Sequence, residues 1–499
     1  MECVTSASFS ISLNGSLHGK FLGKRGLRQG DPMSPALFLL CMEYLSRLIS
    51  LRTSTHIFKY HPRCNELKIS HLIFADDLMF FAKGETHSIK ILIDCLDEFK
   101  HVSGLDINSS KSNIFTAGIF GKDLDDILDL VNYPKGTLPV RYLGVPLAAQ
   151  KLNCVHDAPL HDRIAAYIDK WTANSLSYAG RLLLIKSVLQ GIECFWLQIF
   201  PLPKSVINRI YKLCRAFLWN KKRHPIAWHD ICLPIEEGGL GIRDVYAWNK
   251  ALLSKILWKF HQGTQSLWVR WIHGFYLRNQ SIWTWNPRKD DSTLLKRICD
   301  IRDELTLKFG NYQTVIDALT PLVNDNGLNS SKMYDIFRNE GPRHFWHTAI
   351  WKQFIPPKFS FCTWLACKDR LSTLDNLSYI DTDPMCKLCK NELESAPHLF
   401  FMCPVTNSLW CRIKTWLRIT RTMSTLASAI KWIKKDRVDP ILKKARSIAL
   451  CAFVSHIWKA RNAFIFDGTP FTEEAIFHKI QKHVYKALYF RFPVDLVKF

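Results

Sequence analysis

The chain lacks a run of eighteen apolar residues, and its first ten residues, MECVTSASFS, lack the charged, apolar and small-residue order of a secretory signal. Both absences predict a soluble intracellular protein that does not bind membranes. Paired cysteine patterns are also rare, since most of the sixteen cysteines stand singly among apolar residues, as do Cys95, Cys214 and Cys451. We therefore expect buried free thiols rather than disulfides.

The first 150 residues lack tryptophan and any surplus of charge. They hold 16 Lys and Arg against 15 Asp and Glu, whereas the remaining 349 residues hold 51 against 29 and all 17 tryptophans, beginning with Trp171. This change in composition predicts a domain boundary near residue 150. The basic second part either binds a polyanion such as nucleic acid or simply keeps the surface solvated.

What the first part does contain is an acidic pair between two apolar runs, in ISHLIFADDLMFFA (residues 69–82). The pattern predicts a tight β-hairpin with Asp76 and Asp77 at its tip. Two like charges beside apolar strands are poorly solvated, and a hard divalent cation such as Mg²⁺ would neutralise them. An ordinary polar turn explains the pair as well, because turns favour Asp.

A loop rich in Gly and Pro lies upstream, in RGLRQGDPMSPALFLL (residues 25–40), and opens an apolar helix from about Ala36. Arg28 and Gln29 supply donors for phosphate or sugar oxygens, and Gly30 lets the backbone approach a bulky partner. By itself this loop could be an ordinary helix start.

Four motifs in one order, GLRQGDPMSP, FADD, GLDINSSKS and RYLGVPL, resemble those of the reverse transcriptases of plant LINE-type, non-LTR retrotransposons. The similarity continues through GRLLLIKSVL, FLWNKK and GGLGIRD. It implies an α+β protein in which residues 1–150 form a partial polymerase palm, an antiparallel sheet with helices. Asp76 and Asp77 would bind two Mg²⁺ ions for nucleotidyl transfer. The other implied residues are Arg28, Gln29 and Gly30 in the nucleotide pocket, Lys111 beside the departing pyrophosphate, and Tyr142, Leu143 and Gly144 at the primer end.

From about residue 155 the apolar spacing becomes helical, and the family places its thumb in this region, here 151–235. Further helical patterns predict a helical connector at 236–332. The polar segment 324–332 is expected to be a linker. On the helix that begins near Lys204, apolar residues form one face and basic residues lie off it. The expected nucleic-acid contacts, with a salt-bridged surface as the alternative, are Lys204, Arg209, Lys212, Lys221, Lys222 and Arg223.

Near the other end, Cys386, Cys389, His398 and Cys403 follow a spacing that can close a tetrahedron around Zn²⁺, with no vacant position, as in a structural site. A redox CxxC is the rival, but it lacks the surrounding βαβ pattern and leaves two of the four residues idle. The segment resembles the zinc-binding domain downstream of plant LINE-type reverse transcriptases, here 333–420. A basic helical tail is expected at 421–499.

The resemblance implies an RNA-directed DNA polymerase of the nucleus that acts on an RNA template, a DNA primer and, if active, deoxynucleoside triphosphates, with no protein partner expected. The family has a third metal-binding aspartate, and the fingers, upstream of the GLRQG loop. The first 25 residues contain no Asp. We therefore expect Met1 to be an internal methionine of a longer parent protein, and the chain to be a fragment with impaired activity. The alternative is a non-catalytic nucleic-acid-binding remnant that uses the basic helices and the zinc module.

Overall fold

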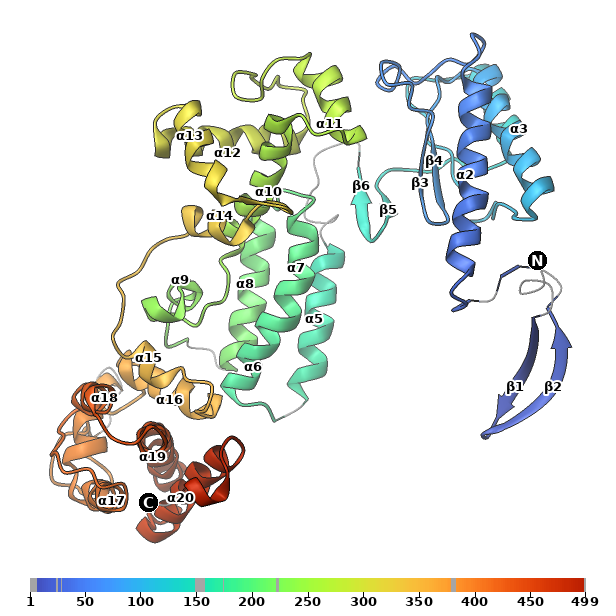
Figure 1. Ribbon diagram of the computed structural model, residues 1–499. Helices are drawn as coiled ribbons and strands as arrows, with labels where there is room; N and C mark the ends of the chain where they lie inside the picture. Colours follow the sequence, from blue (N-terminus) through green and yellow to red (C-terminus); the bar gives the residue numbers. More distant parts are fainter. Residues whose placement is uncertain are drawn as a thin grey trace. The chain divides into compact units, whose positions relative to one another are not determined.

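The computed structural model describes residues 7–23, 26–27, 29–148, 158–173, 175–220, 224–377 and 383–497. The chain forms two compact units (Figure 1). Unit 1 comprises Met1–Lys151 and Lys259–Asn286, and unit 2 comprises Leu152–Trp258 and Pro287–Phe499. The five-domain division predicted from the sequence is finer than these two units and stays a prediction.

Unit 1 combines helices with antiparallel hairpins, and each sheet in the described part of this unit has two strands. Together with the mostly helical unit 2, this confirms the predicted α+β class. The strands are β1 (Ser8–Leu13), β2 (Ser16–Leu22), β3 (His71–Phe74), β4 (Asp77–Phe80), β5 (Val140–Tyr142) and β6 (Val145–Leu147). The helical elements are α2 (Ser34–Thr53), α3 (Thr86–Ser103), α4 (Lys122–Val131), α11 (Leu267–Trp271), η3 (Ile272–Leu277) and the end of α10 (Val245–Gln262).

The core of unit 1 lies between α2, α3 and the β3–β4 hairpin (Figure 1). Leu45 and Ile49 of α2 are fully buried there, and Leu92 and Leu96 place one apolar face of α3 against them. Gly104 ends α3 with φ of +70°, the left-handed conformation that glycine adopts without a steric penalty. The two helices predicted for these segments are confirmed.

Helix α2 is long and apolar enough to cross a membrane by length and composition. A core helix passes the same test, and the buried side of α2 packs on α3. Length and composition therefore do not distinguish the two roles for this helix.

The segment 259–286 joins unit 1 through a contact that no sequence pattern indicated. Trp271 Nε1 donates a hydrogen bond of 2.7 Å to the backbone oxygen of Arg63. The Arg63 guanidinium lies 5.7 Å from the centre of the Phe275 ring, and that ring stacks on Trp271. A part of the expected connector thus packs on the loop between α2 and β3.

The first half of unit 2 is helical, as predicted. Ile207, Ile210 and Cys214 are buried on one face of α8. The described elements of this half are α5 (Ala158–Thr172), α6 (Tyr178–Leu184), η1 (Ile185–Leu189), α7 (Gln190–Leu197), α8 (Lys204–Trp219), α9 (Trp228–Cys232), η2 (Ile235–Glu237), the start of α10, α12 (Thr293–Phe309), α13 (Tyr312–Leu319) and η4 (Thr320–Leu322).

The GGLGIRD motif organises this half of unit 2. A Cβ on Gly239 would lie 1.9 Å from the backbone oxygen of Leu233, so only glycine fits there. Asp244 caps α10 by accepting a hydrogen bond from the backbone N–H of Ala247, and the hydroxyl of Tyr211 donates to its other carboxylate oxygen. The motif therefore has a structural role, in which one aspartate joins α8 to the start of α10.

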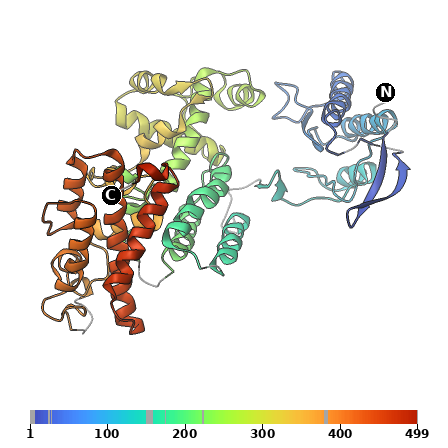
Figure 2. The ribbon, with the colours of Figure 1, turned by 60° about the horizontal axis from the view of Figure 1, so that its bottom comes forward.

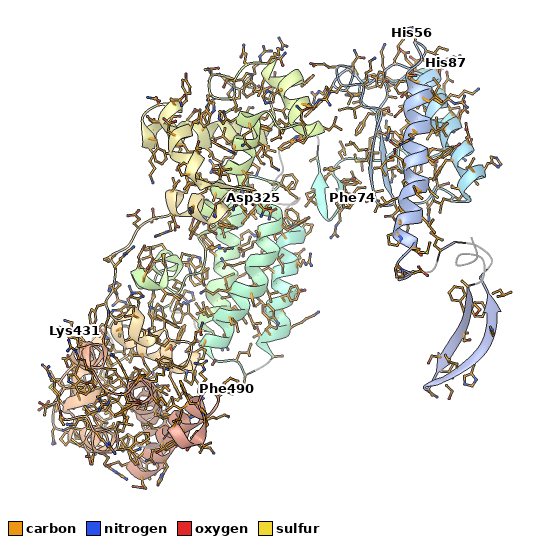
Figure 3. All side chains as sticks on the ribbon, viewed as in Figure 1. His56, Phe74, His87, Asp325, Lys431 and Phe490 are labelled. Carbon is orange, nitrogen blue, oxygen red and sulfur yellow. The ribbon has the colours of Figure 1, made fainter. Side chains whose placement is uncertain are left out.

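The linker predicted at 324–332 is wrong. Its first residues form a small hairpin of β7 (Val323–Asn324) and β8 (Gly327–Leu328), with Asp325 in the turn (Figure 3). Asn329 then caps α14 (Ser330–Phe337) by accepting hydrogen bonds from the backbone of Ser331 and Lys332. The polar residues that predicted a linker form a turn and a helix cap instead, because the same residue types are common in turns, caps and linkers.

The second half of unit 2 surrounds the long helix α19, which packs along α20 (Figure 2, red). Residues from Ala445 to Ile457 of α19 are mostly buried, and α16 lies against them. The basic helical tail expected from the sequence is confirmed as helical. The described elements are α15 (His347–Ile350), α16 (Pro357–Cys367), η5 (Asp375–Leu377), η6 (His398–Met402), α17 (Pro404–Trp416), α18 (Leu426–Lys435), α19 (Pro440–Asp467), α20 (Glu473–Tyr489) and η7 (Val494–Leu496).

Candidate functional sites: an acidic hairpin and a Cys-His centre

The acidic pair lies at the tip of the β3–β4 hairpin, as predicted. Phe74 pairs with Asp77, so Ala75 and Asp76 form a two-residue turn, with Ala75 at φ of +51°. Both aspartates are exposed. Figure 3 labels Phe74 at the tip of the hairpin. His56 and His87, which lie outside the hairpin, are labelled near its other end.

Two kinds of contact fix the hairpin on the helices of unit 1. Ile73, Leu78 and Phe80 pack against the α2–α3 core. The ring of His71 lies between two hydroxyls, with Nε2 2.9 Å from Ser46 Oγ and Nδ1 3.0 Å from Ser70 Oγ. The base of the hairpin is therefore anchored, and the turn that carries the carboxylates is left open to solvent.

Among the other predicted site residues that the structure describes, Tyr142 is the one whose pKa responds to the charge of the acidic pair. Burial, and then the charge of Asp77, raise the pKa of Tyr142. Leu143 and Gly144, with φ of +47° and +85°, form the two-residue turn between β5 and β6 directly after it. The charge of Asp77 in the FADD motif thus acts on Tyr142 in the RYLG motif, although sixty-five residues separate them in the sequence.

The remaining predicted residues of the palm lie apart from the pair. Gln29 and Gly30 form an exposed turn before α2, and Lys111 is exposed in the turn that Asn108 closes. Arg28 lies outside the described residues. In the described part of unit 1, no hydrogen bond or ion pair joins Gln29, Gly30 or Lys111 to either aspartate, and no third potential metal ligand gathers with the two carboxylates.

The second candidate site is a cluster of four side chains in unit 2. The ligand atoms of Cys386, Cys389, His398 and Cys403 all lie within 4.8 Å of one another, and Cys389 Sγ is 3.3 Å from His398 Nε2. Bond lengths of about 2.3 Å to sulfur and 2.0 to 2.1 Å to nitrogen put the donors of a tetrahedral zinc site roughly 3.5 to 3.8 Å apart. The donor set and its spacing fit Zn²⁺.

Local backbone structure places these four donors. Lys390, at φ of +60°, lets its N–H donate to the backbone oxygen of Cys386, which closes the knuckle around the CxxC pair. Cys403 precedes α17 as its N-cap residue, and its N–H donates to the backbone oxygen of His398. One turn and one helix start therefore bring the two halves of the cluster together.

Glu392 orients the histidine of this cluster. Its Oε2 lies 2.9 Å from His398 Nδ1, so a proton on Nδ1 is held by the carboxylate and Nε2 is left free to face the cysteines. The backbone oxygen of the same glutamate accepts from the N–H of Cys386 over 2.8 Å. Glu392 is absent from the residues predicted from the sequence, although an acidic residue between the CxxC pair and the histidine is a signal for such a contact.

A buried ion pair ties this segment to α19. Glu394 is fully buried, and both of its carboxylate oxygens accept hydrogen bonds from Arg461, which is 3% exposed. Glu394 also accepts from the backbone N–H of Leu374, and the ring of Trp458 lies under the guanidinium. This pair explains the IWKARNAF sequence of α19, for which composition and spacing gave no role.

The basic residues predicted on α8 are displayed as expected. Lys204, Arg209 and Lys212 are exposed on the face opposite the buried residues of the helix. Lys221, Lys222 and Arg223 lie outside the described residues. Exposure leaves these side chains available for a polyanion and does not by itself assign one.

A hairpin with paired carboxylates at its tip, on a helical core, together with a four-donor Cys-His cluster, defines a palm-type segment followed by a zinc-binding type of module. Comparison with known families agrees with this. Residues 1–147 match the reverse transcriptase (RNA-dependent DNA polymerase) family, and residues 328–410 match the family described as zinc-binding in reverse transcriptase.

Individual proteins of similar sequence agree with these two family matches. A putative ribonuclease H protein of Arabidopsis thaliana is 24% identical, over 54% of this chain and 57% of its own length. The Pol polyprotein of the type-2 retrotransposable element R2 of Drosophila melanogaster is 27% identical, over 47% of this chain and 22% of its own. An uncharacterised 149 kDa protein of the Xenopus laevis transposon TX1 is 26% identical, over 48% and 18%. The matches thus span less than two thirds of each of these relatives.

Two segments of the chain thus match a reverse transcriptase family and its zinc-binding family, and two of the relatives come from the transposable elements R2 and TX1. This confirms the resemblance that the motifs indicated.

Proposed function

We propose that this chain forms the palm, thumb and zinc-binding part of an RNA-directed DNA polymerase that binds an RNA template and a DNA primer. The observation that carries the proposal is the exposed carboxylate pair of Asp76 and Asp77 at the turn of the anchored β3–β4 hairpin, whose charge also acts on Tyr142 of the RYLG motif. In this proposal Asp76 and Asp77 hold catalytic metal, and Tyr142 to Gly144 position the primer end beside them.

Divalent metal, with Mg²⁺ proposed, would supply activation of the primer hydroxyl and neutralisation of the triphosphate. The two exposed carboxylates offer the hard oxygen ligands that suit this ion. Gln29 and Gly30, with Arg28 before them, would shape the nucleotide pocket, and Lys111 would neutralise pyrophosphate as it departs. These assignments follow the motifs of the family.

We further propose that the chain alone extends primers poorly. Among the described residues only two carboxylates gather at the hairpin tip, and each lost group of this kind costs a factor of about 10² to 10³ in rate. Primer extension on an RNA template, with and without Mg²⁺, tests both statements. Robust extension that Asp76→Ala abolishes would support the polymerase site and refute the impairment, whereas equal weak extension by both proteins would remove catalysis from the proposal.

If catalysis fails, the function that remains is nucleic-acid binding by the basic part of the chain. The exposed basic residues of α8 and the charge surplus after residue 150 favour it. Binding of the purified chain to RNA and DNA, with a matched variant in which Lys204, Arg209 and Lys212 become Gln, tests this function independently of the acidic hairpin.

The Cys-His centre is proposed to hold one structural Zn²⁺ through Cys386, Cys389, His398 and Cys403. Four protein donors leave no position for a substrate, and three of them are buried. The Glu392 carboxylate supports this assignment, because an outer contact of this kind fixes the orientation of a ligating histidine. The Glu394–Arg461 pair holds the same segment against α19.

A further inference from the structure

Three helices of unit 2 present lysines around one spot of its surface. The ring of Phe359, next to Lys358 in α16, lies 5.7 Å from the ring of His456 in α19 and 5.0 Å from that of His483 in α20. The two histidine rings stack with their centres 5.3 Å apart. These ring contacts fix where the three helices meet.

Five exposed lysines, which we call the lysine cluster, surround this meeting point. One is Lys358, and Lys459 follows His456 by three residues on α19. On α20, Lys479 lies four residues before His483 and Lys486 three residues after it, so both share its face of the helix. The members of the cluster are Lys358, Lys459, Lys479, Lys482 and Lys486.

The cluster has no acidic counterpart. In the described part of the chain no ion pair engages any of the five lysines, and the three helices together contain only Asp467, Glu473 and Glu474. The two glutamates pair with Arg412 and His478 at the start of α20. A surface that serves solubility alone mixes charges of both signs, and this one does not.

The positive charges of the cluster act on one another and on the histidines between the helices. Burial, followed by Lys459 and Lys486, lowers the pKa of Lys358. Burial, followed by His483 and the lysines, lowers the pKa of His456 to about 4, so this histidine is neutral at physiological pH. Unneutralised repulsion of this kind costs stability, and a bound polyanion relieves it.

We propose that the lysine cluster binds the phosphate backbone of a nucleic acid, as a second contact surface distinct from the basic face of α8. This inference rests on the proposed nucleic-acid function. Five lysines without acidic partners supply the positive charge that attracts backbone phosphates, and contacts to phosphates carry no sequence information, so we expect binding that is independent of sequence.

The test compares two triple variants of the full chain that lose the same charge. In the cluster variant Lys358→Gln, Lys459→Gln and Lys486→Gln are combined. The control variant combines Lys431→Gln, Lys434→Gln and Lys435→Gln, three exposed lysines of α18. Figure 3 shows Lys431 on the opposite side of this part of unit 2 from Phe490, which follows α20. A fluorescent DNA duplex and a single-stranded RNA are titrated at several salt concentrations.

We expect the cluster variant to bind more weakly than the control variant. Its log–log salt slope on duplex DNA should fall by about 0.9 for each lysine that contacts a phosphate. Its melting temperature should equal or exceed that of the wild type, because repulsion is removed, which separates a binding role from a structural one.

Equal losses in the two variants would overturn the cluster and leave nucleic-acid binding in place. A wild-type chain that binds neither probe would overturn the proposed function and the cluster with it. A cluster variant that keeps its nucleic-acid affinity but loses binding to phosphatidylserine vesicles would assign the surface to a membrane and also overturn the inference.

Discussion

The acidic hairpin and the Cys-His centre are built in opposite ways. The carboxylates of Asp76 and Asp77 are exposed on a two-residue turn, and anchoring contacts lie only at the base of the hairpin. The donors of the Cys-His centre are mostly buried, and Glu392 and Glu394 tie the segment that carries them to its surroundings. In the functions that we propose, the open pair receives substrate and metal together, and the closed cluster holds the fold. The two regions should therefore respond differently to substitution.

Loss of the Cys-His centre should have the largest effect. Cys389→Ser should abolish stoichiometric zinc and unfold the segment around it, because structural zinc contributes apparent binding free energies of about 10 to 16 kcal/mol in small zinc modules. Metal analysis and thermal melting with and without chelator measure this. Cys411→Ser, at an exposed cysteine outside the cluster, is the control and should change neither quantity. Zinc content near zero in the wild type would contradict the assignment.

The Glu394–Arg461 pair should come next. Removing one partner of a buried ion pair leaves an uncompensated charge and costs about 3 to 5 kcal/mol, so Arg461→Met should strongly lower the free energy of unfolding. Combining it with Glu394→Gln should recover much of that loss. Denaturant unfolding of the single and double variants gives the comparison. Additive losses would show that the two side chains act independently.

These contacts show where sequence reasoning succeeds and where it stops. The FADD hairpin and the CxxC knuckle are local, so two apolar runs around a turn and the spacing of the cysteines predicted them. The Glu394–Arg461 pair joins residues 67 positions apart, and Trp271 reaches Arg63 across 208. Such partners depend on tertiary packing, which no local pattern encodes. The error at 324–332 has another cause, since Asn and Gly serve turns, caps and linkers alike.

A buried acid outside both regions should give a smaller, pH-dependent effect. Glu193 on α7 is 4% exposed, and burial raises its pKa to about 8. The folded chain keeps a proton that the unfolded chain loses above about pH 4.3, so stability falls as pH rises from there to about 8. Glu193→Gln should be more stable than the wild type above pH 8, by a few kcal/mol on the order of the pKa shift.

Urea unfolding at acidic and alkaline pH tests this, because the variant and the wild type should converge near pH 4. Glu340→Gln, at an exposed glutamate, provides the control and should show no such difference. A constant difference between Glu193→Gln and the wild type at all pH values would mean that packing, and not titration, separates them.

The smallest expected effect is on the pKa of Tyr142, and it tests whether the charge of Asp77 acts on that residue. Burial and the charge of Asp77 both raise the pKa of Tyr142, so Asp77→Asn should lower that pKa while leaving the part due to burial. The exposed position of Asp77 predicts almost no change in stability, within about 0.5 kcal/mol. Titration of ring-labelled tyrosine by NMR, with Tyr142→Phe to assign the signal, measures it. Tyr133, whose pKa is raised by burial and then by Asp97 and Asp106, should not respond. If Tyr142 is equally unresponsive, the charge of Asp77 does not act on it in solution, and the proposed polymerase site loses the link between its FADD and RYLG motifs.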